Sequence, residues 1–301
     1  MTHLEERGTG KVVAAVLNPD RLLTFGLAIV FAIACGLVVM IVATVLSGMR
    51  PLLADVALFR FVTDPGWHPT VGQYGFMPML AGTTLAALGA IGLALPVAVA
   101  IGVALHFYLP PPVAAAARGA FFVAAATPSV VFGFWGLLKV VPAIGAVAPP
   151  GASLLAGAIM LALMILPTTA LLVDVALSKI PSPLLHGAHA LGARRSLICA
   201  GLALPIVRRS VFAAGILGVA RAFGETIVVL MVTGNRAEFP ASVFDPVRTM
   251  TATVALEIGY AKPLHAAALH FCILLLFVVS AALALGVHIL NGRDEQGRLD
   301  V

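Results

Sequence analysis

The sequence has few charged residues. Only 10% of its 301 residues are Asp, Glu, Lys or Arg, whereas 61% are hydrophobic. A soluble domain does not need so much apolar surface, and runs of about 20 apolar residues are typical of bilayer-spanning helices. The shortage of charge therefore excludes a water-soluble protein and predicts an integral membrane protein of the all-α class.

Cysteine is also scarce. Cys35, Cys199 and Cys272 lie in or beside apolar segments and have no paired spacing. Such a pattern indicates neither a disulfide framework nor a metal site, and we expect no cofactor. The net charge of +5 comes from basic residues spread among the loops. We interpret these as topology signals rather than as a nucleic-acid surface.

The apolar residues fall into six segments that are long enough to cross a bilayer. We predict membrane spans at 22–46, 79–107, 120–140, 153–173, 210–232 and 265–290. The first is too long for the apolar region of a cleavable signal and is expected to stay in the protein. A polar segment, 1–21, precedes it, and a short polar tail, 291–301, follows the last span.

Three successive spans contain a proline in their middle, at Pro96, Pro128 and Pro167. Membrane helices tolerate proline when neighbouring helices satisfy the freed backbone groups. The pattern fits kinked helices around a cavity, and it fits ordinary packing kinks equally well.

Six spans place both termini on one side of the membrane. If the N-terminus is inside, eleven Lys and Arg residues lie in the inner segments and five in the outer loops. Basic residues accumulate in cytoplasmic loops, so both termini are expected in the cytoplasm. The polar connector at 174–209 is then cytoplasmic as well.

Within this connector the sequence predicts two short helices. Ser182 can cap a helix, Pro183 suits the first helical position, and Gly192 permits a left-handed stop. A second helix could follow through Arg194. Two helices joined at a glycine would form a rigid knob for a partner, although periodicity alone favours a plain amphipathic linker at the membrane surface.

The connector resembles the cytoplasmic signature of the permeases of bacterial ABC importers. That signature runs E-A-A, three residues, G, nine residues, I, one residue, L-P. The same spacing occurs here, with His and Gly in place of the first E-A and Leu in place of Ile, at His186, Gly187, Ala188, Gly192, Leu202, Leu204 and Pro205. The resemblance implies that these residues lie in a segment, 180–205, that contacts an ATPase. We call it the coupling segment.

Four further runs are similar to the PstC-type permeases of the phosphate-specific transport (Pst) family: 128–136, 220–226, 231–235 and 244–252. The similarity extends over about 75–290 and implies a type I ABC importer permease domain there, with the MetI-like fold. It implies a multi-pass protein of the bacterial cytoplasmic (inner) membrane that passes inorganic phosphate.

The resemblance also implies partners. These are a second permease subunit (PstA-type), a cytoplasmic ATPase dimer (PstB-type) and an external phosphate-binding protein (PstS-type), besides phosphate and membrane lipid. The chain has no G-x-x-x-x-G-K-[ST] run, the loop that cradles nucleotide phosphates. ATP hydrolysis is therefore expected on the separate ATPase, and the chain is not expected to be an enzyme.

Other functions stay open at this point. They are an ABC permease for a different oxyanion or solute, a stand-alone ion-coupled secondary carrier, and a membrane enzyme acting on a lipid. A carrier usually has paired repeats with interrupted helices, which the sequence does not suggest. An enzyme would need clustered acids or metal ligands, and we find none within the predicted spans.

Arg221 and Glu225 are the charged residues expected clear of any span boundary. Arg221 lies eleven residues past Ser210, about 16 Å along a helix, where a charge costs roughly 2.5 to 3.5 kcal/mol. Four residues apart on one helix, the two could form a neutralised structural pair. Alternatively, the planar guanidinium could bind phosphate oxygens while Glu225 limits how tightly it holds them. The Pst resemblance favours this substrate path, with Thr226 and Ser129 as further hydroxyl donors.

Overall fold

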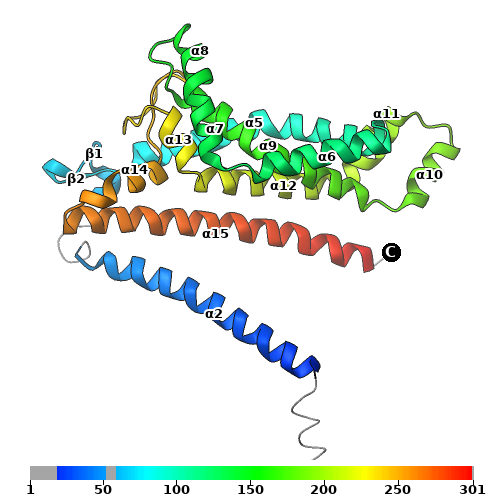
Figure 1. Ribbon diagram of the computed structural model, residues 1–301, viewed down its shortest axis with the longest axis horizontal. Coiled ribbons are helices and arrows are strands. Elements are labelled where there is room, and N and C mark those ends of the chain that lie inside the picture. Colours follow the sequence, from blue (N-terminus) through cyan, green and yellow to red (C-terminus); the bar gives the residue numbers. More distant parts are fainter. Residues whose placement is uncertain (1–18, 52–58, 300–301) are drawn as a thin grey trace, which may run out of the picture.

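The structure is a computed structural model that describes residues 19–51 and 59–299 (Figure 1). Most of the expected N-terminal segment 1–21 lies outside the described residues. The chain is helical almost throughout, with one short antiparallel hairpin in which Trp67 lies opposite Tyr74.

Five helices have the length and apolar composition of membrane spans, and a sixth span is broken in two. Among the described residues the spans are Leu23–Gly48, Met77–Tyr108, the bent pair Pro111–Ala126 and Ser129–Gly145, Leu154–Ser178, Arg195–Gly224 and Pro263–Ile289. Each overlaps one predicted segment. With the bent pair counted as one span, the six-span all-α prediction is confirmed.

The spans and their connections divide into elements as follows. The chain forms, in order, α2 (Pro19–Gly48), α4 (Arg60–Thr63), β1 (Trp67–His68), η1 (Pro69–Val71), β2 (Gln73–Tyr74), α5 (Met77–Val103), η2 (Ala104–Tyr108), α6 (Pro111–Ala126), α7 (Ser129–Trp135), η3 (Gly136–Val140), α8 (Val141–Gly145), α9 (Leu154–Ser178), α10 (Ser182–Ala190), α11 (Arg195–Leu197), η4 (Ile198–Ala203), α12 (Leu204–Gly224), α13 (Ile227–Val232), α14 (Met250–Glu257), η5 (Ile258–Tyr260) and α15 (Pro263–Leu299).

The core of the bundle is the contact of α9 with α5 and α12. Along α5 a buried alanine recurs every fourth residue, at Ala86, Ala90, Ala94 and Ala98. Lipid tails are as apolar as leucine, so membrane helices associate through close packing that small side chains allow. The alanine row lets α9 approach closely. α9 fills the interface with larger side chains such as Met160, Met164 and Ile165.

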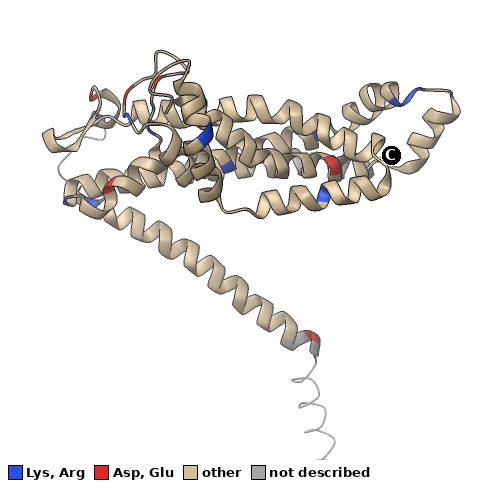
Figure 2. Ribbon diagram, turned by 45° about the horizontal axis from the view of Figure 1, so that its top comes forward, with Lys and Arg blue, Asp and Glu red and all other residues tan. Residues whose placement is uncertain are grey.

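The two ends of the bundle differ. α10 and α11 lie at one end together with the C-terminal end of α15, whereas β1, β2 and α14 lie at the other (Figure 1). We call these the α10 end and the hairpin end. α2 meets α15 near the hairpin end and diverges from the bundle toward Pro19. It carries no charge from Leu22 onward, as expected of a helix exposed to lipid (Figure 2).

Only one of the three mid-span prolines breaks its helix. α5 and α9 continue through Pro96 and Pro167, whereas the chain turns by 89° between α6 and α7. Thr127 there is extended, with ψ of 131°, the conformation that a following proline favours. Pro128 therefore redirects the third span rather than kinking it slightly.

A second interruption corrects the predicted fifth span, 210–232. α12 ends at Gly224, Glu225 is extended with ψ of 131°, and α13 begins at Ile227. The two short helices that follow the interruptions pack together: a Cβ added at Gly133 of α7 would lie 2.8 Å from Sδ of Met231 in α13. The expectation that no span is interrupted, which counted against a stand-alone carrier, is wrong.

Candidate functional site

Arg221 faces α9 from the last turn of α12. Its side chain is half-buried, and its Nη1 donates a hydrogen bond of 3.4 Å to Oγ1 of Thr168. Thr168 directly follows Pro167 and donates its own hydroxyl proton to the Ile165 carbonyl at 2.9 Å. A charge within a span is expected to face protein or a water-filled path rather than lipid, and this contact meets that expectation.

Glu225 does not pair with Arg221. Because α12 ends between them, the two are not neighbours on one helix face, and no ion pair joins them among the described residues. The Glu225 carboxylate accepts hydrogen bonds from the backbone N–H groups of Ile227 and Val228 at 3.1 and 3.2 Å. A carboxylate on the first N–H groups of a helix is a capping arrangement. The expected i, i+4 pair is thus replaced by a cap on α13.

The interruption itself is held from α14. Oγ1 of Thr251 donates to the Glu225 carbonyl at 2.8 Å, so the extended residue does not leave its carbonyl oxygen unsatisfied. At the far end of α13, Asn235 has φ of 56°, and its Nδ2 donates to the Leu230 carbonyl at 2.7 Å. Side chains of neighbouring elements therefore close both ends of this short helix.

Ser129 and Thr226 lie beside the two interruptions. Ser129 is the first residue of α7 after Pro128, and Thr226 precedes the first residue of α13; both are half-buried. The structure brings α7 and α13 together, as described above. In the described part of the chain, neither hydroxyl forms a hydrogen bond to Arg221 or Glu225.

The coupling segment forms the two helices that the sequence predicts. α10 ends at Ala190, Gly192 has φ of 81°, and α11 begins at Arg195. The N–H of Ala193 bonds the Ala188 carbonyl at 3.1 Å and that of Gly192 bonds the His189 carbonyl at 2.9 Å. These two bonds are the glycine-dependent Schellman stop. One detail differs, since Pro181 rather than Ser182 takes the N-cap position and no side chain caps the helix.

Most of the coupling segment is open to the surroundings. His186, Gly187, Gly192 and Pro205 are exposed, Ala188 and Leu202 are half-buried, and Leu191 is 90% exposed. Leu185 alone of α10 packs against the cluster that contains Leu177 and Ile180 at the end of α9. The segment therefore presents a largely uncovered surface at the α10 end (Figure 1).

The structure contains two charged clusters that the sequence did not predict. At the α10 end, Arg118 of α6 holds Asp174 of α9 through Nε to Oδ2 at 2.7 Å and Nη2 to Oδ1 at 3.0 Å. His106 Nδ1 lies 3.8 Å from Oδ1 of the same carboxylate. Asp174 is only 5% exposed, so Arg221 and Glu225 are not the only charged residues inside the bundle. Single charges near predicted span ends were the only signal available.

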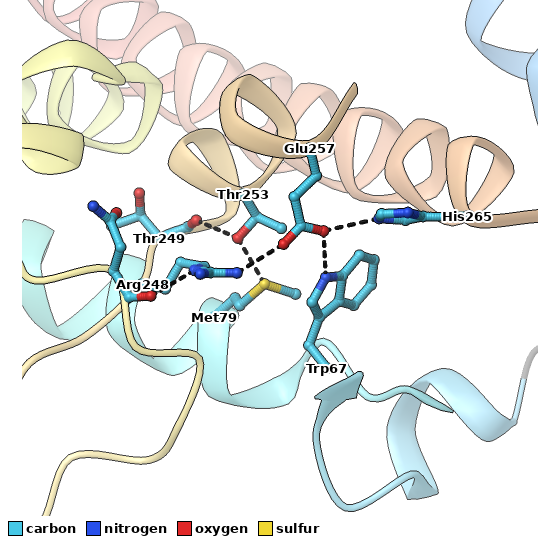
Figure 3. Close-up of polar contacts among 8 residues, drawn as sticks. Trp67, Met79, Arg248, Thr249, Thr253, Glu257 and His265 are labelled. Atoms are coloured by element: carbon cyan, nitrogen blue, oxygen red, sulfur yellow. Dashed lines mark hydrogen bonds and ion pairs between the residues drawn. The ribbon is translucent and has the colours of Figure 1, made fainter. Parts of the chain in front are cut away.

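The second cluster surrounds Glu257 at the hairpin end (Figure 3). Trp67 Nε1 donates to Oε2 at 2.8 Å, His265 Nε2 lies 2.8 Å from the same oxygen, and Arg248 Nη1 donates to Oε1 at 2.8 Å. Arg248 also donates from Nε to the Asn235 carbonyl at 2.8 Å. One buried carboxylate thereby joins the hairpin, the loop after α13, α14 and α15. Arg248 thereby ties the loop after α13 to α14.

Asp245 holds the loop before Arg248 in a turn. Oδ2 of Asp245 accepts from the backbone N–H groups of Ala241 and Ser242, both at 2.8 Å.

In the adjoining hairpin, burial raises the pKa of Tyr74, an effect that the nearby Arg60 partly opposes. Tyr74 therefore stays neutral where it packs edge-on against Trp67.

Interrupted spans, one of them broken beside a half-buried arginine, are typical of multi-pass membrane transport proteins. Residues 94–293 match the family model described as "Binding-protein-dependent transport system inner membrane component". The chain belongs to this family.

Three relatives are similar to most of this chain. The probable ABC transporter permease protein YqgH of Bacillus subtilis is 33% identical over 75% of this chain and 77% of its own length. The phosphate transport system permease proteins PstC of Mesorhizobium japonicum and Haemophilus influenzae are 28% and 29% identical, over 74% and 73% of this chain and 75% and 76% of their own lengths.

Solved structures agree on the fold. Two chains of the MetNI methionine ABC transporter, in inward-facing conformations, superpose with TM-scores of 0.51 and 0.55. They cover 72% and 74% of this chain and 94% and 98% of their own, at 18% and 16% identity. The MetI-like ABC permease fold expected from the sequence is confirmed.

Proposed function

We propose that this chain is a permease subunit of an ATP-driven importer that passes inorganic phosphate across the cytoplasmic membrane. The observation that carries the proposal is Arg221. Its charge is half-buried, no carboxylate neutralises it among the described residues, and a threonine hydroxyl is its hydrogen-bond partner. Its other guanidinium donors are suited to the oxygens of an oxyanion. Relatives that bear the name of phosphate permeases agree with this cargo.

The site residues take distinct roles in this proposal. Arg221 binds phosphate through its planar fork. Glu225, which follows it across the break in the fifth span, places a negative charge nearby and keeps phosphate from being held too tightly, because a transport path must release what it binds. Ser129 and Thr226, at the starts of the two adjoining short helices, supply hydroxyl donors to the same path.

The coupling segment contacts the ATPase. Its exposed residues His186, Gly187 and Gly192, with Ala188, Leu202 and Pro205 on the same two-helix unit, form the docking surface. A second permease, an ATPase dimer and an external phosphate-binding protein complete the importer. The α10 end then lies in the cytoplasm, and the N-terminal segment 1–21 and the tail 291–301 lie there too.

Reconstitution tests the cargo and the energy source together. The chain is placed in proteoliposomes with a second permease, an ATPase dimer and a phosphate-loaded external binding protein, and uptake of labelled phosphate is measured. We expect uptake that requires ATP and that excess unlabelled sulfate leaves unchanged. Uptake of sulfate in place of phosphate would support a permease for a different oxyanion. Uptake by the chain alone, without ATP, would support an ion-coupled carrier.

A further inference from the structure

The cluster of Arg118, Asp174 and His106 has no part in the roles described so far. Its centre is a two-point ion pair, with the Asp174 side chain 8% exposed and that of Arg118 36% exposed. Arg118 also donates from Nη2 to the Leu105 carbonyl at 3.3 Å. Ionisable residues inside membrane spans are costly and usually serve a function.

The pair adds a charged contact to a modest apolar one between α6 and α9. α6 has a single buried residue, Ala114, whereas α5 and α9 contact each other through a long row of buried alanines. α5 presses on α9 at the very position of the pair, since a Cβ added at Gly102 would lie 3.2 Å from the Asp174 backbone nitrogen. The position of Asp174 is thus fixed by close packing, and Arg118 ties α6 to that fixed point.

Each partner leads to a different part of the proposed transport machinery. Asp174 lies in the last turns of α9, just before the coupling segment, where Leu177 and Ile180 pack against Leu185 of α10. Arg118 lies on the helix that ends at the break before Ser129. A continuous path therefore leads from α10 to the break before Ser129. It consists of packed side chains, the Arg118–Asp174 ion pair and α6.

We propose that Arg118 and Asp174 are positioning residues that pass movements of the coupling segment to the turn before Ser129. The proposal rests on the coupling role assigned above to that segment. A chain of packed side chains between two sites can carry energetic coupling, and demonstrating it requires a change of coupling rather than of stability. The quantity to measure is therefore phosphate moved per ATP hydrolysed, at matched subunit abundance.

The main variant replaces both residues, Arg118→Leu with Asp174→Leu, in the complete importer. Hydrophobic replacement of a buried ion pair is often neutral or stabilising, so the subunit is expected to insert and to co-purify with its partners. We expect phosphate moved per ATP to fall about tenfold, within the range seen for changes along coupled networks. The control is Arg236→Gln with Glu238→Gln, which removes an exposed pair (61% and 60%) at the hairpin end and is expected to leave the ratio unchanged.

Three results would overturn the proposal. The first is an unchanged ratio in the double leucine variant. The second is a parallel fall of ATP hydrolysis and uptake in a double variant that still accumulates, which marks a purely structural pair. If the double variant does not accumulate, Arg118→Lys is measured instead, because it keeps the charge and loses the two-point geometry. A normal ratio of phosphate moved to ATP hydrolysed in Arg118→Lys is the third result that would overturn the proposal. Gly192→Trp is measured alongside: if it couples normally while the leucine variant does not, the route through the coupling segment is wrong and the importer function stands.

Discussion

Arg221 is bound differently from the other arginines inside the bundle. Arg118 and Arg248 each hold a buried carboxylate, at 2.7 and 2.8 Å, whereas Arg221 contacts the neutral Thr168. The sequence left a neutralised pair and an anion site open for this residue. The break in the fifth span argues against the neutralised pair, because it turns Glu225 toward α13; the anion site stays a proposal.

This difference predicts the effect of Arg221→Lys. Lysine keeps the positive charge but presents a point charge in place of a planar fork. We expect normal insertion and assembly, with phosphate uptake at matched subunit levels reduced about tenfold, as for the loss of one charge-assisted hydrogen bond. Lys262→Arg, at an exposed position of the hairpin end, is the control and should transport normally. Wild-type uptake by Arg221→Lys would falsify bidentate binding.

Glu225 offers a second prediction at this scale, since its two proposed roles respond to different substitutions. Glu225→Gln retains an oxygen that can accept from Ile227 and Val228, whereas Glu225→Leu removes the cap as well as the charge. We expect Glu225→Leu to lower the free energy of unfolding of the subunit by about 1 kcal/mol and Glu225→Gln to preserve it.

The same two variants test the charge. If the Glu225 carboxylate limits how tightly Arg221 holds phosphate, Glu225→Gln lowers both the KM and the maximal rate of uptake, because binding tightens and release slows. Uptake kinetics in reconstituted vesicles measure both quantities. An unchanged KM and rate in Glu225→Gln would leave capping as the only role of this residue.

At the scale of elements, the coupling segment is the part that local sequence predicted best. Its helix, its stop at Gly192 and its second helix depend on short-range chemistry: a proline near the start and a left-handed glycine at the end. All the backbone bonds that close α10 lie within a few residues of one another. No distant contact was needed to predict them.

The coupling role predicts the effect of Gly192→Trp. Gly192 is exposed, and no atom lies within 4 Å of a Cβ placed there, so the side chain would start in open space. The left-handed backbone costs a non-glycine residue about 1 to 2 kcal/mol, and the bulk would separate the segment from a docked ATPase. We expect the subunit to insert, ATP hydrolysis to continue and phosphate uptake to be lost.

A matched control separates docking from general bulk. Gly26 of α2 also has nothing within 4 Å, and Gly26→Trp should transport normally because Trp is favoured near membrane interfaces. Normal coupled transport by Gly192→Trp would support a plain linker at the membrane surface instead of a docking surface.

The interruptions of the third and fifth spans were less accessible to sequence reasoning. Pro128 signalled a kink and produced an 89° turn, while the break at Glu225 has neither proline nor a run of polar residues to mark it. That break is stabilised in part by Thr251, 26 residues further along the chain, a contact that no local pattern could have revealed. The Glu225 carbonyl is satisfied by this side chain from α14, whereas the Glu225 N–H donates to the Ala222 carbonyl at 3.3 Å.

At the scale of the whole molecule, the arrangement of the ends predicts topology. The coupling segment and the C-terminal end of α15 share one end of the bundle (Figure 1), as the two spans between them require. We expect reporter fusions after Ser47, Pro149 and Pro240 to report the outside, and fusions after Pro111 and Ser182 to report the cytoplasm. One reversed site among these five would contradict the six-span orientation.

The sequence by itself determined the membrane class, the number of spans, the coupling segment and the family resemblance. These follow from composition, from apolar runs and from spacings within one stretch of chain, where each residue acts on its near neighbours. Only the tertiary structure decided which charges meet. Arg118 and Asp174 are 56 residues apart, and Trp67 and Glu257 are 190 apart. Such pairs depend on which helix faces pack together, and packing within lipid is governed by close fit among small residues rather than by a pattern in one segment.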